Sequence, residues 1–248
     1  MSKEHILPKW LRREFPEYTD APTHQRTINE NEGRDPHGPR VAYRRDETKN
    51  GLFNDQARVV CTGCNNGWMS QLEKRVREPL SQMIRGLPVV LTGERQALVS
   101  LWVVKTLMVS YRGPQLGGRP TSEIILPVDP ESLYRDAALG PTMVVSVSFY
   151  EPETSPGELV YAESFTRMEH EHGLYSYVAS LKLGHFVAQL GRAPDGVRPP
   201  LGLAPYLLPD RVALLCPGAA SVNWPPAKPV YGRAGWEKHV TLPERIGY

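Results

Sequence analysis

The spacing of apolar residues changes once along this sequence, and that change constrains the fold class. Between residues 65 and 111, apolar residues recur at three- and four-residue steps, which is the period of an amphipathic helix. After residue 143 they alternate with polar residues or form short β-rich runs between turn residues, as in antiparallel strands. We therefore predict an α+β fold in which two helices precede a mainly antiparallel sheet.

The pattern also predicts the bounds of these elements. The first helix runs from Asn65 to about Ile84, and the second lies between Thr92, a suitable N-cap, and Gly113-Pro114. Four strands are expected, at residues 143–150, 159–165, 174–181 and 186–190. The apolar run at residues 212–215 is expected to be a final strand, followed by an irregular tail.

The N-terminal part combines a short helix with a long polar segment. Residues 16–57 are rich in Pro, Gly, Asn and charge, which predicts a loop insertion, and alternating stretches near residues 26–28 and 41–44 could pair within it as a hairpin. Residues 57–60 predict a short strand leading into Cys61. We expect residues 1–86 to form one region and residues 87–248 a second.

Composition excludes some classes of protein. The chain has 248 residues, of which 40% are hydrophobic and 23% charged, enough for one large domain or two small ones. It contains neither an apolar run of the roughly 18 residues that a membrane span needs nor a signal-peptide pattern, so we expect a cytoplasmic protein without a membrane partner. The net charge of +2 means that phosphate binding would require a local basic patch.

Cys61-Thr-Gly-Cys64 is the strongest local motif. Two thiolates two residues apart, with a glycine in the turn, are typical of a zinc knuckle. Structural zinc takes four ligands, and His24 and His37 are the candidates to complete the set. A redox pair is the alternative, although its usual βαβ surroundings are not evident. Cys216 is interpreted as an ordinary buried thiol.

Glu4-His5-Ile6-Leu7-Pro8 is the second motif. A carboxylate beside a histidine can bind a hard metal ion while the imidazole activates water as a general base. Taken alone, the dipeptide is more readily interpreted as a surface pair near the N-terminus.

The two motifs together resemble the HNH (ββα-metal) nucleases, in which two strands and a helix hold one catalytic divalent ion. The segments EHILPKWL, VVCTGCNNGWMSQLE, LWVVKTLMV and VNWPPAKP are similar to a family of bacterial and phage HNH-like proteins. The resemblance implies a treble-clef-like ββα-metal core at the N-terminus. That family carries a further Cys-x-x-Cys before its Glu-His dipeptide, whereas this sequence has only the pair at 61 and 64.

The resemblance also implies roles for individual residues. His5 would be the general base, while Glu4 and Asn65 would hold Mg²⁺ or a similar ion. Cys61 and Cys64 would bind structural zinc. The motif's middle asparagine, which supports the loop of the histidine, would correspond to Asn54 or Gln56. Three basic residues close to the Glu-His motif could contact phosphates: Lys9, Arg12 and Arg13.

Other residues are expected to be structural. Trp102 is expected in the core, and Lys105 to extend its stem along apolar surface towards water. His170 and His172 are assigned to a solvated turn, since no third metal ligand is nearby.

These features predict an HNH-type endonuclease that hydrolyses phosphodiester bonds, with DNA as the expected partner. The alternative is a catalytically inactive HNH-fold module that binds nucleic acid or another protein. A third hypothesis gives the function to the C-terminal sheet, as a binding surface for a protein partner.

Overall fold

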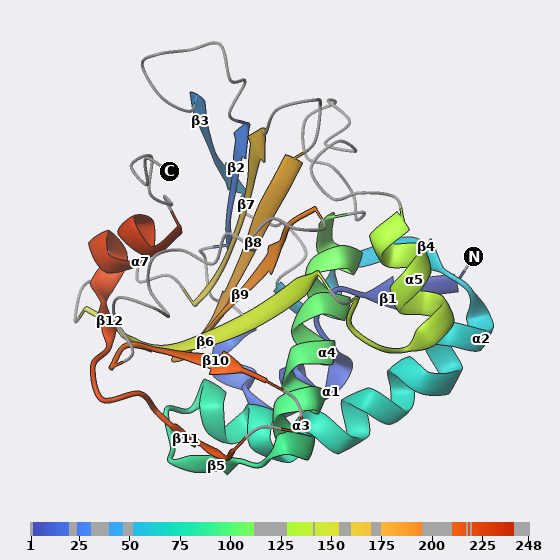
Figure 1. The fold of residues 1–248 in the computed structure, drawn as a ribbon, viewed down its shortest axis with the longest axis horizontal. Coiled ribbons are helices and arrows are strands. Elements are labelled where there is room, and N and C mark those ends of the chain that lie inside the picture. Colours follow the sequence, from blue (N-terminus) through green and yellow to red (C-terminus); the bar gives the residue numbers. More distant parts are fainter. Residues whose placement is uncertain are drawn as a thin grey trace.

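The structure is a computed structural model (Figure 1), and it describes residues 2–19, 24–30, 40–46, 52–111, 128–140, 142–153, 160–169, 175–194, 210–216, 218 and 220–240. Its main feature is an eight-stranded, mainly antiparallel sheet with helices on both faces. The α+β class and the antiparallel character of the sheet, both predicted from the sequence, are confirmed.

Four long strands form the centre of the large sheet and pair antiparallel with one another in this order: β6 (Met143–Glu151), β9 (Phe186–Arg192), β8 (Tyr175–Leu183) and β7 (Tyr161–Glu169). On one side, β10 (Val212–Leu215) and β12 (Val230–Tyr231) both pair with β6. On the other side, β2 (His24–Glu30) runs parallel to β7, and β3 (Arg40–Asp46) pairs with β2. The sheet therefore joins strands from both ends of the chain.

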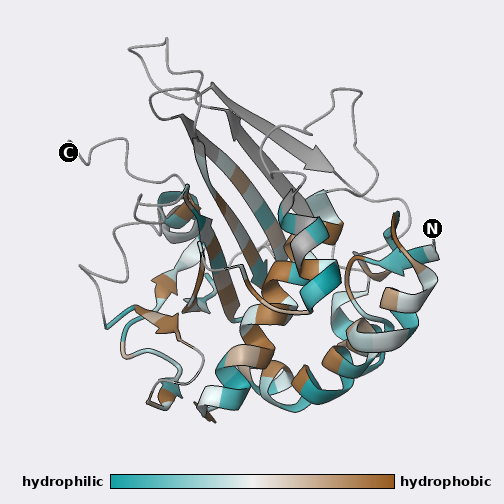
Figure 2. Cartoon of the chain, turned by 45° about the vertical axis from the view of Figure 1, so that its right-hand side comes forward, coloured by the Kyte–Doolittle hydropathy of each residue, from teal (hydrophilic) through white to brown (hydrophobic). Residues whose placement is uncertain are grey.

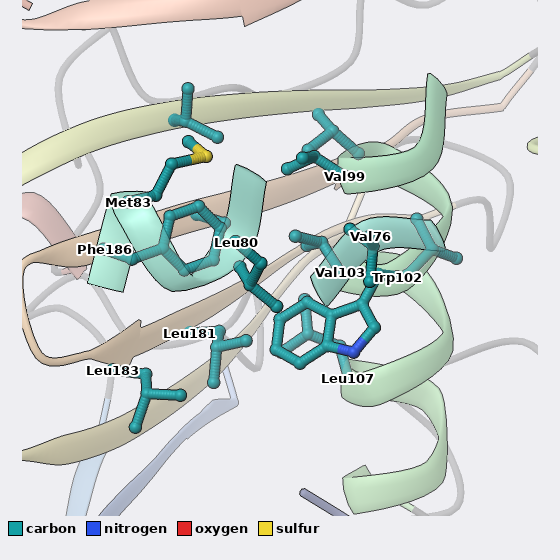
Figure 3. Close-up of a cluster of buried hydrophobic side chains, with 14 of the residues drawn as sticks. Val76, Leu80, Met83, Val99, Trp102, Val103, Leu107, Leu181, Leu183 and Phe186 are labelled. Atoms are coloured by element: carbon teal, nitrogen blue, oxygen red, sulfur yellow. The ribbon is translucent and has the colours of Figure 1, made fainter. Parts of the chain in front are cut away.

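Helices α3 (Ser70–Ile84) and α4 (Gly93–Tyr111) cover one face of this sheet. Every residue of α4 from Val99 to Tyr111 is buried except Leu101, because the helix lies between α3 and the strands (Figure 2). In Figure 3 the two helices and strands β8 and β9 meet around Trp102, which is 0% exposed and packs near Phe186. This core holds the two helices against the sheet.

The opposite face of the sheet is partly covered by α7 (Gly232–Val240). A second, smaller core cluster joins this helix to the sheet through Trp236 and Val240, which pack with Tyr150 and Val187. The prediction of an irregular tail after residue 215 is therefore wrong, because β11 (Val222–Trp224), β12 and α7 all follow that residue.

The N-terminal part of the chain consists of short elements, and its first strand lies on the right in Figure 1. These elements are β1 (Ser2–His5), α1 (Lys9–Glu14), short 3-10 turns at Pro16–Tyr18 and Leu52–Asn54, β4 (Gln56–Val60), α2 (Thr62–Cys64) and a π-helical turn, η3 (Asn65–Met69), that runs into α3. Helix α5 (Val128–Asp136) lies beside them, and β5 (Val89–Leu91) pairs with β11 below. None of the helices in the described ranges is long and apolar enough to span a membrane.

The segment 16–57, expected as a loop insertion, contributes β2 and β3 to the large sheet. The hairpin predicted within it is confirmed, since β2 and β3 pair antiparallel from His24↔Asp46 to Glu30↔Arg40. Its attachment to β7 was not predicted. The boundary expected at residue 86 falls between α3 and β5, and both sides contribute to one hydrophobic core.

Candidate functional site

Two strands that are distant in the sequence bring the two predicted motifs together. β1 pairs antiparallel with β4, so that Glu4 lies opposite Ala57 and His5 opposite Gln56, with an irregularity between Ser2 and Glu4. β4 leads directly into Cys61, and the helical turns that follow start at Thr62. The structure therefore places the Glu-His motif beside the strand that carries the knuckle.

His5 lies at the end of β1, where it is partly buried. The side-chain nitrogen of Gln56 lies 2.8 Å from Nε2 of His5. Because an amide nitrogen donates, Nε2 accepts and the proton of the neutral ring is on Nδ1. Gln56, one of the two residues considered for the middle position of the motif, therefore contacts the histidine.

The electrostatic surroundings of His5 favour its neutral form. Burial lowers the pKa of His5 below its ordinary value, and the positive charges of Lys9 and Lys105 lower it further. The Glu73 carboxylate acts in the opposite direction but does not outweigh them. At neutral pH the ring is consequently able to accept a proton.

Glu4 is buried and is held by an ion pair that the sequence did not reveal. Nζ of Lys105 lies 3.2 Å from the Glu4 carboxylate and 2.9 Å from that of Glu73. Lys105 is 0% exposed, so the expectation that it extends towards water is wrong. Burial raises the pKa of Glu4 by more than the attraction of Lys105 lowers it.

A signal for this ion pair was present in the sequence. Lys105 interrupts an otherwise apolar stretch, LWVVKTLMV, on a helix that is buried nearly all round. A lysine in such a position requires a buried carboxylate as partner, because an isolated charge is costly to remove from water. The partners themselves could not be read from the sequence, since Glu4 is 101 residues away.

Asn65 ties the start of the helical segment to β1. Its side-chain nitrogen donates to Oγ of Ser2 at 3.1 Å and to the backbone oxygen of Lys3 at 3.2 Å. The backbone N–H of Asn65 donates to the carbonyl of Cys61. Asn65 is thus a bridge between the knuckle and the strand that carries Glu4 and His5.

The two cysteines of the knuckle form a tight, exposed turn. The backbone N–H of Cys64 donates to Sγ of Cys61 at 3.0 Å, and the Cys64 thiol lies 4.0 Å from the carbonyl of Tyr134. Hydrogen bonds from Cys64 lower the pKa of Cys61, whereas the same contact and burial raise that of Cys64. Cys61 is exposed and Cys64 partly so. Cys216 is also exposed, so its interpretation as a buried thiol is wrong.

The three basic residues predicted to contact phosphates are all exposed on α1: Lys9, Arg12 and Arg13. Lys9 is near enough to His5 to affect its pKa. Arg12 donates to Oδ1 of Asn54 at 3.3 Å, which steadies the guanidinium next to the site. These cations lie in the helix that directly follows the candidate general base.

The donor chemistry around His5 suits a divalent ion in part. Glu4 and Asn65 both offer side-chain oxygens, the donors that Mg²⁺ prefers, and such an ion keeps several waters of its own. One Glu4 oxygen, however, already accepts from Lys105. Within the described ranges, no three His, Cys, Asp or Glu side chains gather closely enough to hold a metal.

Four of the histidines lie where the structure gives no side-chain description. His24 is in β2, and His37, His170 and His172 lie outside the described residues. The prediction that His24 or His37 completes the zinc site therefore lies outside what the structure describes.

No family model, curated protein or solved structure matches this chain. Its function is therefore inferred from the residues of the site and their geometry.

Proposed function

We propose that this chain is an HNH-type, metal-dependent endonuclease that hydrolyses phosphodiester bonds in DNA. The observation that supports it most is His5, partly buried and with a lowered pKa, paired across β1 and β4 with Gln56. In this proposal β1, β4 and α3 form the ββα-metal core. The enzyme would act in the cytoplasm.

His5 would act as the general base. Its Nε2 lone pair, which accepts from Gln56, would take a proton from the attacking water once that water replaces the amide. Glu4 and Asn65 would hold the divalent ion, which would supply positive charge near the leaving oxygen. Lys9, Arg12 and Arg13 would bind neighbouring phosphates and fix the register of the strand.

The experiment is a cleavage assay on plasmid and linear DNA with Mg²⁺, Mn²⁺ or Ni²⁺, with and without EDTA. We expect metal-dependent cleavage that His5→Ala reduces by about 10²- to 10⁴-fold, the usual contribution of a general base. Lys74→Ala, an exposed substitution on α3, is the control and should cleave like the original chain. Wild-type protein that is inactive with every metal, or His5→Ala that is fully active, would refute the proposal.

The pH profile provides a separate test. A general base must be deprotonated, and burial together with Lys9 and Lys105 lowers the pKa of His5. Cleavage should therefore persist below pH 6.5, the ordinary pKa of histidine, and fall only at a lower pH. A fall in rate centred above pH 6.5 would contradict this role for His5.

The second candidate function is a catalytically inactive HNH-fold module that binds DNA or another protein. It is favoured by the ion pair between Glu4 and Lys105, because a carboxylate that already has a buried counter-ion is a weaker ligand for a divalent ion. Fluorescence anisotropy with labelled DNA separates the candidates. Binding that Arg12→Ala and Arg13→Ala weaken, without cleavage under any metal, would identify the module.

A further inference from the structure

The knuckle presents half of a zinc site at the surface of the molecule. Cys61 is the N-cap of α2; its sulfur accepts from the backbone N–H of Cys64, and the two thiols also interact with each other. Cys61, Thr62 and Gly63 are all exposed, and a Cβ built on Gly63 would meet only the Cys61 sulfur, at 3.8 Å. Cys61 is thus open to another molecule, and Cys64, whose thiol lies 4.0 Å from the carbonyl of Tyr134, is partly exposed beside it.

The described residues around the knuckle do not complete this site. Structural zinc takes four ligands, and among the residues with known placement no third histidine, cysteine or carboxylate joins Cys61 and Cys64. His185 instead stacks on Phe149, and His239 lies in α7, which Figure 1 shows at the opposite end of the molecule from α2. β2, which carries His24, also lies in the large sheet away from α2. Two thiolates fit zinc in kind but not in number.

We propose that one zinc ion joins two copies of this chain, each contributing Cys61 and Cys64. The two copies are related by a two-fold axis that passes through the ion, and each supplies two thiolates. Together they complete a tetrahedral four-thiolate site without any further partner. Binding releases the four thiol protons and leaves a site with net charge −2. The exposed Lys3 and Arg58 of the β1–β4 sheet, which leads into the knuckle, place positive charge nearby. This proposal does not depend on nuclease activity.

The test uses the full chain in a phosphine reductant, with zinc added from zero to one equivalent. Light scattering during gel filtration should give 27.8 kDa without zinc and twice that mass with it, and the metal content should saturate at half an ion per chain. X-ray absorption should show four sulfurs at about 2.3 Å from the zinc. EDTA should raise the apparent dimer dissociation constant by about 100-fold or more.

Variants identify the ligands. Cys61→Ser and Cys64→Ser should each abolish zinc-dependent dimerisation, whereas Cys216→Ser, at the other exposed cysteine, should leave it unchanged. Circular dichroism checks that the serine variants are folded, which is expected because the knuckle is exposed. A cobalt-substituted dimer should show the intense absorption of tetrahedral thiolate coordination and lose it in either knuckle variant.

Three outcomes would overturn the proposal. One zinc per monomer would mean that the remaining ligands come from the same chain. A zinc-dependent dimer that survives in the Cys61→Ser/Cys64→Ser double variant would place the ion elsewhere. Absence of zinc binding, with an intramolecular disulfide formed under hydrogen peroxide, would identify a redox pair instead. None of these outcomes bears on the His5→Ala cleavage test, so the two proposals can fail separately.

Discussion

Lys105 is the residue on which the burial of Glu4 depends. Its ammonium contacts the carboxylates of Glu4 and Glu73, and it is 0% exposed. Replacing it with methionine would keep most of the volume but leave a buried carboxylate without its counter-ion. We expect Lys105→Met to lower the free energy of unfolding by about 3 kcal/mol, measured by urea denaturation.

Two further variants make that prediction specific. Lys105→Met/Glu4→Gln should recover much of the lost stability, since it removes the unpaired charge as well as its partner. Lys74→Met, at an exposed position of α3, should stay within about 0.5 kcal/mol of the original chain. Equal stability of Lys105→Met and the original chain would show that Glu4 does not need this partner.

Sequence motifs gave the order of the candidate site residues along the chain, whereas the residues that meet them through the fold were not predicted. The motif gave His5 and left Asn54 and Gln56 as alternatives for its supporting residue, and the structure brings Gln56 into contact with His5. The contact between Glu73 and Lys105 was not predicted, because it depends on how α3 packs against α4. The position of Lys105 in an apolar helix indicates that it needs a partner, but the spacing of residues along the chain does not identify which carboxylates pair with it.

At the scale of elements, α7 is the part that local sequence predicted least well. Two of its nine residues are glycines, which have low helix propensity, and three prolines, at positions 225, 226 and 229, shortly precede it. Its position depends instead on tertiary contacts, namely the packing of Trp236 and Val240 and a hydrogen bond from Gln189 to the carbonyl of His239. Such contacts override propensity, whereas α4 and the central strands were predictable from periodicity alone.

The docking of α7 should weaken in acid because of His239. Nε2 of His239 is buried without a hydrogen-bond partner, and burial lowers the pKa of its ring to about 4. The unfolded chain, with a pKa near 6.5, therefore binds the proton first, so stability is full above about pH 6.5 and is lost as the pH falls towards 4. The loss is at most about 3 kcal/mol, since part of the residue is exposed to solvent.

The matched variant is His239→Gln, which cannot gain this charge. Urea denaturation at pH 7 and pH 4.5 should show a smaller fall in stability for the variant than for the original chain. Other groups titrate in both proteins, so only the difference between them reports on His239. An identical pH dependence would indicate that the ring is hydrated or partnered when folded.

At the scale of the whole molecule, the N-terminal and C-terminal parts share one hydrophobic core. Leu7 and Leu80 belong to the same cluster as Leu181 and Phe186. We therefore expect a single cooperative transition in calorimetry of the full chain. A fragment of residues 1–111 should show no cooperative transition, because it exposes the face of α4 that the sheet covers. Two resolved transitions, or a folded fragment, would contradict a shared core.

The ion pair between Glu4 and Lys105 also has a consequence for biosynthesis. Glu4 leaves the ribosome 101 residues before the lysine that neutralises it, so on the nascent chain its carboxylate must remain hydrated and β1 cannot be buried in its final place. Ribosome-bound chains arrested before residue 105 should consequently keep their first residues open to proteases. Chains arrested well beyond α4 should begin to protect them.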